Sequence, residues 1–215
     1  MSTITILQKL SIASAGAVLV GLGTVSSAQA FSFTESGDAG QTLSNAQRLA
    51  GGITQIRGNY QSNNADLYSF LWNGGTFSAN TLGSSVSDPQ LFLFNSQGLG
   101  VIGNDDNMGT LQSNFSLALS PGLYYLGISG YDYDPVSIAG YIFTDNFPGV
   151  QTPTRTGGAF PLSDWNGYMV SSSGAYQINI SETASESVPE PTSILGLLTS
   201  GVMGCIWKSK QKKKA

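Results

Sequence analysis

The sequence from residue 52 to residue 181 consists of short β-prone runs separated by turns rich in glycine, proline and asparagine. Turn residues of this kind tolerate the backbone angles that reverse the chain, and runs this short fit strands better than helices. Such a series is typical of an antiparallel β-sandwich or jelly roll. We therefore predict an all-β fold, with strands at residues 53–57, 67–72, 76–80, 90–95, 100–103, 113–119, 122–129, 139–144 and 175–180.

The composition excludes several classes of function. The chain has no histidine, and its one cysteine, Cys205, lies near the C-terminus. The common catalytic triads and the commonest transition-metal ligand are therefore missing. Residues 31–188 contain three arginines and twelve acidic side chains, and hence carry a net charge of −9. Because nucleic acids are bound by cationic side chains, no nucleic acid is expected as a partner, whereas divalent cations suit this charge.

The N-terminus, residues 1–30, has the three parts of a secretory signal peptide. Lys9 supplies a positive charge, residues 12–23 are apolar, and Ala28 and Ala30 form a small-x-small cleavage site. We predict cleavage after Ala30 by signal peptidase. A buried N-terminal helix is the alternative. Residues 31–51 then form a polar segment that leads into the sandwich.

The C-terminus, residues 188–215, follows a linker at 182–187 and also has three parts. The motif Val188, Pro189, Glu190 and Pro191 precedes an apolar stretch at about 192–207 and a basic tail at 208–214. The apolar stretch is near the lower length limit for a membrane span, and the lysines would keep the chain end in the cytoplasm.

This order of features resembles the PEP-CTERM sorting signal of Gram-negative bacteria. The resemblance implies an exosortase as processing partner and transient anchoring in the cytoplasmic membrane. It also implies delivery to the cell surface or to extracellular polysaccharide. A plain tail anchor is the alternative.

Four stretches together resemble the bacterial pre-peptidase C-terminal domain. They are "NADLYSF" (64–70), "SDPQLFLFNSQGLGVIGNDDN" (87–107), "LSPGLYYLGISG" (119–130) and "SGAYQINI" (173–180). The resemblance implies a β-sandwich at 52–181 that is an accessory, non-catalytic module. The sequence departs from the family between its third and fourth stretches, where residues 131–173 form a long insertion. Its aromatic residues predict partial ordering against the sandwich.

A run of oxygen-bearing side chains predicts a Ca²⁺ site. Asn104, Asp105, Asp106 and Asn107 follow one another in a loop, and Asp88 and Asp66 lie at the edges of predicted strands. Adjacent carboxylates repel each other unless a cation or hydrogen bonds compensate, and Ca²⁺ prefers six to eight oxygen ligands. A solvated turn is the alternative. No cofactor is required by the sequence, and Ca²⁺ is the candidate.

Within the insertion, Asp132, Asp134 and Trp165 are candidates for a ligand-binding loop. Paired acids beside aromatic rings occur at carbohydrate sites, although an ordinary turn and packing of Trp165 on the sandwich edge are the alternatives. The leading interpretation of the chain is an exported, non-enzymatic surface or matrix protein with a structural or adhesive role. A Ca²⁺- or carbohydrate-binding module is the second hypothesis, and a glycosidase-type enzyme is the third.

Overall fold

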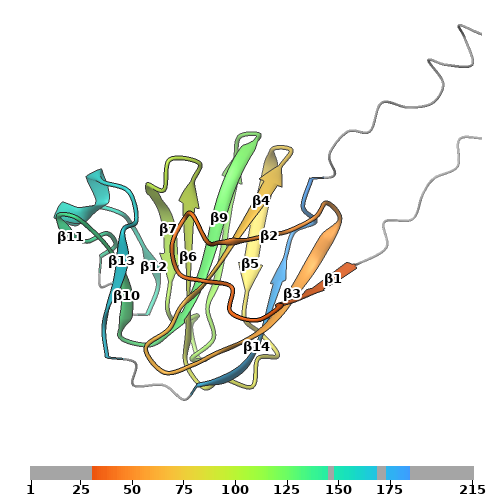
Figure 1. The fold of residues 1–215 in the computed structure, drawn as a ribbon, viewed down its shortest axis with the longest axis horizontal. Coiled ribbons are helices and arrows are strands. Elements are labelled where there is room, and N and C mark those ends of the chain that lie inside the picture. Colours follow the sequence, from red (N-terminus) through yellow and green to blue (C-terminus); the bar gives the residue numbers. More distant parts are fainter. Residues whose placement is uncertain (1–30, 145–147, 169–172, 185–215) are drawn as a thin grey trace, which may run out of the picture.

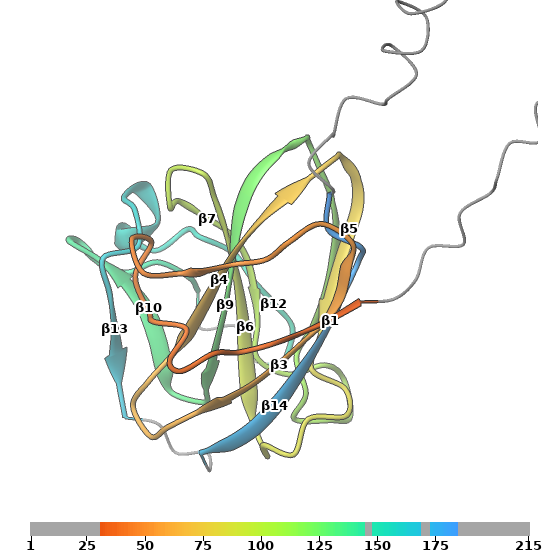
Figure 2. The same cartoon turned by 45° about the vertical axis from the view of Figure 1, so that its right-hand side comes forward.

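The computed structural model describes residues 31–144, 148–168 and 173–184, which fold into two sheets packed face to face with a smaller third sheet (Figures 1 and 2). The five-stranded sheet contains, in spatial order, β1 (Phe31–Thr34), β3 (Ile53–Tyr60), β14 (Gly174–Ile180), β5 (Gly75–Asn80) and β8 (Asn114–Leu119). The six-stranded sheet contains β12 (Val150–Gln151), β7 (Gly100–Asn104), β6 (Pro89–Asn95), β9 (Gly122–Gly130), β4 (Asp66–Trp72) and β2 (Gln47–Arg48).

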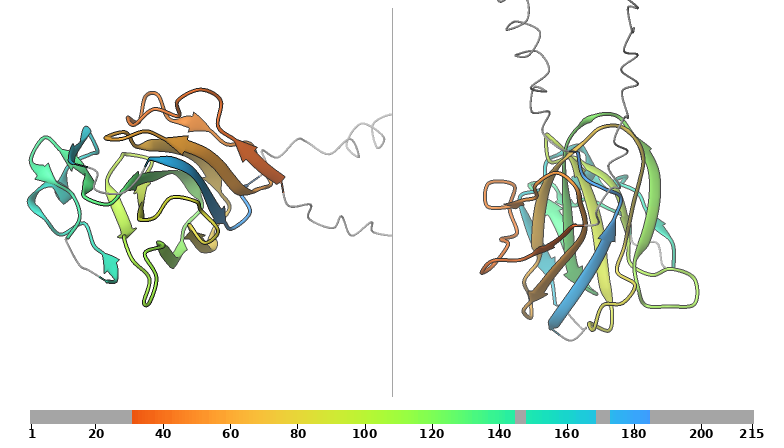
Figure 3. Two further views of the ribbon diagram at one scale, coloured as in Figure 1. Left: turned by 90° about the horizontal axis from the view of Figure 1, so that it is seen from below. Right: turned by 90° about the vertical axis from the view of Figure 1, so that its right-hand side faces the viewer.

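The insertion forms most of the remaining structure. It contributes a three-stranded sheet in the order β11 (Gly140–Tyr141), β10 (Tyr133–Ser137) and β13 (Asp164–Gly167), and a 3₁₀ turn, η1 (Thr156–Ala159). These strands lie beside β7 and β6, at one side of the sandwich (Figures 1 and 3). The predicted ordering of this segment is therefore confirmed for its described residues.

The predicted all-β fold is confirmed, and eight of the nine predicted strands are present. The strand predicted at residues 139–144 is wrong, because only Gly140 and Tyr141 pair with a neighbour. Ile142 and Phe143 are buried as loop residues, so core packing and not strand pairing accounts for their apolar character. The sheets are also not purely antiparallel, since β1 runs parallel to β3 and β2 runs parallel to β4.

The predicted signal peptide, sorting motif and hydrophobic helix lie outside the described residues. Among residues 31–144, 148–168 and 173–184, no helix is long and apolar enough to cross a membrane.

The space between the two large sheets is filled by aromatic side chains. Alternate residues of a strand point to the same face, which directs Tyr68, Phe70 and Trp72 of β4 towards the five-stranded sheet. Phe70 stacks on Phe77 with ring centroids 5.1 Å apart, and Trp72 meets Phe77 edge to face at 5.3 Å. On the five-stranded sheet, Tyr60 stacks on Tyr176 at 5.6 Å. Aromatic pairs at such distances add to the hydrophobic stabilisation of the core.

On the other face of the six-stranded sheet, the insertion packs over β6 and β9. Phe92 of β6 lies 5.2 Å from the ring centroid of Phe143 and 5.7 Å from that of Trp165. Gly127 of β9 pairs with Phe92 and leaves space for the Trp165 ring, because a Cβ at Gly127 would come within 3.0 Å of it. This second layer explains why β6 is buried on both faces.

We expect Gly127→Val to destabilise the fold by about 1 to 3 kcal/mol, because the added side chain would push Trp165 away from the sheet. Gly122→Ala is the matched control on the same strand, since its Cβ would meet only Tyr124, at 3.7 Å. Urea unfolding followed by tryptophan fluorescence measures both variants. Equal stability of the two variants would contradict the packing described here.

Candidate metal centre

Three carboxylates meet where β6 begins and β7 ends. Asp88 precedes Pro89, the first residue of β6, and Asp105 follows Asn104, the last residue of β7. The antiparallel pairing of β6 with β7 sets Leu91 opposite Asn104, and this brings the two strand ends together. Asp88, Asp105 and Asp106 form the Asp88 cluster, in which one oxygen of each carboxylate lies within 4.8 Å of the others.

The Asp88 cluster is poorly solvated. Asp105 is 1% exposed and Asp106 is 6% exposed, and Asp88 is half-buried. The Oδ1 atoms of Asp88 and Asp106 are buried without a hydrogen-bond partner among the described residues. Burial raises the pKa of Asp88 to about 6, and the Asp106 carboxylate adds to this rise. Burial also raises the pKa of Asp106.

The separation of these oxygens suits a shared cation. Ca²⁺ binds oxygen at about 2.3 to 2.6 Å, so two oxygens on the same ion lie at most about 5 Å apart. The 4.8 Å limit within the Asp88 cluster meets this condition. A cation there would also offset the charge of Asp106, which adds to the rise that burial causes in the pKa of Asp88.

The two asparagines of the predicted site have other positions. Asn104 donates from Nδ2 to the carbonyl oxygens of Asp106 at 3.0 Å and Gly149 at 2.8 Å, and its Oδ1 accepts from the Asn114 amide at 2.7 Å. It therefore holds the loop in shape and does not offer its oxygen to the cluster. Asn107 lies beyond the cluster, where its backbone amide donates to the Gln112 carbonyl at 3.0 Å.

Ser113 is a structural residue of this loop that the sequence did not single out. Its buried Oγ lies 2.6, 2.7 and 2.8 Å from the carbonyl oxygens of Pro89, Asn104 and Asp105. One hydroxyl hydrogen serves a single carbonyl at a time, so the three carbonyls converge on one donor. A lone serine before a strand gives no signal of this role in the sequence.

Asp66 belongs to a second group and not to the Asp88 cluster. Its carboxylate lies within 4.8 Å of ligand oxygens of Glu35 and Asp38, and these three residues are the Asp66 cluster. Glu35 accepts from the backbone amides of Ala39 at 2.9 Å and Asn59 at 2.8 Å. The segment at 31–51 thus brings acids from the start of the chain to β4, a contact that no local pattern indicates.

A hydrogen-bonded chain connects the Asp66 cluster to the core. Tyr176 donates to Oδ2 of Asp66 at 2.7 Å and shares a short hydrogen bond with the Tyr68 hydroxyl. Oδ1 of Asp66 is buried without a hydrogen-bond partner among the described residues. Burial raises the pKa of Asp66 to about 7, and the charges of Glu35 and Asp38 add to the rise, although the bond from Tyr176 opposes it. Burial also raises the pKa values of both tyrosines.

The candidate ligand residues of the insertion are separated by the fold. Asp132 is exposed, in a turn with a φ of 65°, and Asp134 lies in β10, where it accepts from Nε2 of Gln90 at 3.2 Å. Trp165 is 5% exposed, and its Nε1 donates to the Gln41 carbonyl at 2.8 Å. The structure therefore places Trp165 against the sheet and leaves Asp132 and Asp134 at the rim of a pocket.

We expect the free energy of unfolding to fall as the pH rises from about 4 to 7 when metal ions are removed with EDTA. Folded Asp66 keeps its proton up to a pKa of about 7, while unfolded Asp66 loses it near 3.8. The folded state therefore binds the extra proton, and stability is lost as the pH passes through this window, by on the order of a few kcal/mol.

Urea unfolding of the wild type and Asp66→Asn at a series of pH values tests this. The variant should show a shallower decline, because it lacks the carboxyl group whose pKa is raised to about 7. A difference in the free energy of unfolding that is the same at every pH reports hydrogen bonds lost in the variant. The test is therefore the slope of the free energy of unfolding against pH. Exposed Asp164→Asn is the control. Identical slopes in the wild type and Asp66→Asn would contradict the assignment.

No protein-family model matches the sequence, and no curated protein has significant sequence similarity to it. Among solved structures, the chain is similar to the crystal structure of the pre-peptidase C-terminal domain of collagenase from Bacillus anthracis. That match covers 63% of this chain and 93% of the other, at 14% identity and a TM-score of 0.37. A likeness at this level identifies neither a shared activity nor shared site residues.

Proposed function

We propose that this chain is an exported, non-catalytic module with a structural or adhesive role at the bacterial cell surface or in extracellular matrix, and that it binds Ca²⁺ at the Asp88 cluster. The observation that carries the metal-binding part is the approach of three carboxylates to within 4.8 Å, with Asp105 and Asp106 buried. Three negative charges at this separation destabilise the folded state unless protons or a cation compensate.

The chemistry of the Asp88 cluster favours Ca²⁺ over softer metals. All of its side-chain ligands are carboxylate oxygens, which suit hard cations, and the chain has no histidine. Ca²⁺ also tolerates irregular coordination, and waters complete its shell where the protein supplies few ligands. Extracellular modules bind Ca²⁺ with dissociation constants of about 0.1 to 1 mM, which suits a site of three carboxylates.

The export and sorting part of the proposal rests on the two ends of the sequence. A cleavable signal ending at Ala30 would direct the chain out of the cytoplasm. The segment at 188–215 would then hold it at the membrane until an exosortase acts, with its basic tail in the cytoplasm. The pre-peptidase C-terminal resemblance of the sequence supports a non-catalytic role for the sandwich.

We expect 10 mM Ca²⁺ to stabilise the protein by about 1.4 to 2.7 kcal/mol relative to EDTA, which is the effect of a ligand at 10 to 100 times its dissociation constant. Thermal unfolding of the full chain with Ca²⁺, Mg²⁺ and EDTA measures this. Asp106→Asn should lose most of the Ca²⁺ effect, because it removes one charged ligand from the Asp88 cluster.

Two further variants keep the result specific. Asp38→Asn alters the Asp66 cluster alone, and exposed Asp164→Asn alters neither cluster. Retention of the Ca²⁺ effect in Asp106→Asn together with its loss in Asp38→Asn would assign the ion to the Asp66 cluster. No stabilisation of the wild type by Ca²⁺ would overturn the metal-binding part of the proposal.

The sorting part predicts where the protein is found in a Gram-negative host with an exosortase. We expect the full chain to fractionate with envelope or matrix material, and a chain ending at residue 187 to be released as soluble secreted protein. Mass spectrometry of the wild type should show a mature C-terminus near Pro189–Pro191. Recovery of the full chain in the cytoplasm would refute export. An intact C-terminus would favour a plain tail anchor.

A further inference from the structure

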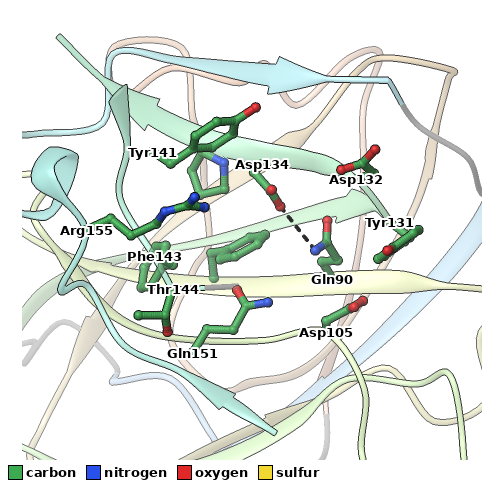
Figure 4. A pocket seen from close by; sticks show the side chains of 12 residues that line it. Gln90, Asp105, Tyr131, Asp132, Asp134, Tyr141, Phe143, Thr144, Gln151 and Arg155 are labelled. Atoms are coloured by element: carbon green, nitrogen blue, oxygen red, sulfur yellow. Dashed lines mark hydrogen bonds between the residues drawn. The ribbon is translucent and has the colours of Figure 1, made fainter. Parts of the chain in front are cut away.

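A polar pocket lies where the insertion meets the outer face of the six-stranded sheet (Figure 4). Its volume is about 50 Å³. The sheet side contributes Gln90 and Gln151, and the loop after β7 contributes Asp105. The remaining wall comes from the insertion, with Asp132, Asp134, Tyr141 and Arg155 as its main polar side chains. The pocket is therefore built by the segment in which the sequence departs from the family that it resembles.

The base of the pocket holds a polar atom in need of a donor. Gln90 is 2% exposed, and its Nε2 donates to Oδ1 of Asp134 at 3.2 Å. Its Oε1 is buried and has no hydrogen-bond partner among the described residues. A buried amide oxygen without a donor costs about 1 to 3 kcal/mol, so a ligand hydroxyl that donates to it would bind favourably.

The opposite wall supplies hydrogen-bond donors from the exposed side chain of Arg155. The guanidinium carbon of Arg155 lies 4.9 Å from the centroid of the Tyr141 ring, in a cation–π contact. Figure 4 shows this guanidinium directed towards Asp134. Arginine donates through five N–H groups in a rigid plane, so the stacked side chain can serve neighbouring oxygen atoms of one ligand.

The size and charge of the pocket limit the ligand. A space of about 50 Å³ is several times the minimum that one water needs, but far below a typical drug-sized pocket. It therefore admits a pair of hydroxyl groups and not a whole ring. The lining of the pocket carries more negative than positive charge, with Asp105, Asp132 and Asp134 against Arg155. An anionic ligand would therefore be repelled.

The pocket also differs from the two carboxylate clusters. Neither Asp132 nor Asp134 lies in a group of three or more carboxylates within 4.8 Å, among the residues that the structure describes. The pocket offers hydrogen-bond acceptors on its carboxylates, donors on its arginine, and both on its amides. Adjacent sugar hydroxyls both donate and accept hydrogen bonds, so they match this set.

We propose that this pocket binds two adjacent hydroxyl groups of a neutral hexose, at the edge of a glycan. In this arrangement, the hydroxyls donate to Oε1 of Gln90 and to the Asp134 carboxylate and accept from Arg155. The inference rests on the proposed function only for access to glycans outside the cell, since the binding itself is a property of the pocket.

The test is a saturation-transfer NMR titration of the purified full chain, in a detergent without a sugar headgroup. The probes are methyl α-D-glucoside, methyl α-D-galactoside and methyl α-D-mannoside, with glucosamine and glucuronate as the charged comparison. We expect at least one methyl hexoside to bind with a dissociation constant on the order of 1 mM, because few hydrogen bonds are formed.

Two variants locate the binding. Arg155→Gln and Asp134→Asn should each weaken it about fivefold or more, the effect of losing a charge-assisted hydrogen bond. Arg57→Gln and Asp164→Asn remove the same charges from exposed positions outside the pocket and should bind as the wild type does. Thermal unfolding of each variant confirms that it is folded.

Three results would overturn the inference. They are no binding of any methyl hexoside, unchanged binding in both pocket variants, and binding of glucosamine or glucuronate alone. Because the titration uses purified protein, none of these results depends on export or sorting. The titration is repeated with Ca²⁺ and with EDTA. Sugar binding that is absent in both conditions shows that the pocket does not bind sugar, whether or not the Asp88 cluster binds an ion.

Discussion

The contact between Trp165 and Gly127 holds the insertion against the sandwich, and the candidate pocket depends on it. The indole ring lies over a glycine of β9, beside Phe92 of β6, and its Nε1 is satisfied by the Gln41 carbonyl. Removing a buried tryptophan typically costs about 3 to 5 kcal/mol, a large share of the stability of one domain. A long connection that is fixed by such an anchor can present polar groups in defined positions, which a free loop of the same length could not do.

Several of the described acidic side chains lie around one end of β9. Asp66 is the strand partner of Ile128 in β9. Pro89, which follows Asp88, is the strand partner of Gly130 at the end of β9. The insertion begins directly after this strand and brings Asp132 and Asp134 to the same end. Asp105 belongs to the Asp88 cluster and also lines the pocket, so a cation in the cluster would fix a wall of the pocket as well.

Local patterns in the sequence predict the sandwich well, because its strands are bounded by turn residues that act locally. They fail at residues 139–144, where Ile142 and Phe143 are buried as loop residues and Phe143 packs on Phe92 of β6. The grouping of Asp88 with Asp105 and Asp106 follows from a hairpin and is close to what the sequence indicates. The sequence pattern places Asp66 with the loop at 104–107, but Asp66 lies beside Glu35 and Asp38. This position depends on the parallel pairing of β1 with β3 and of β2 with β4, which joins distant segments and has no local signal in the sequence.

The last described residue leaves the sandwich far from its acidic end. The Ala184 amide donates to the Leu71 carbonyl at 2.9 Å, near the end of β4, whereas Asp66 begins that strand. Five residues of extended chain place these two points about 17 Å apart. In Figure 1 the coloured end of the chain after β14 lies at the top, opposite the start of β4. A surface attached to the chain after Ala184 would therefore meet the molecule at the end of β4 opposite Asp66, and the Asp66 cluster would stay about one strand length from the point of attachment.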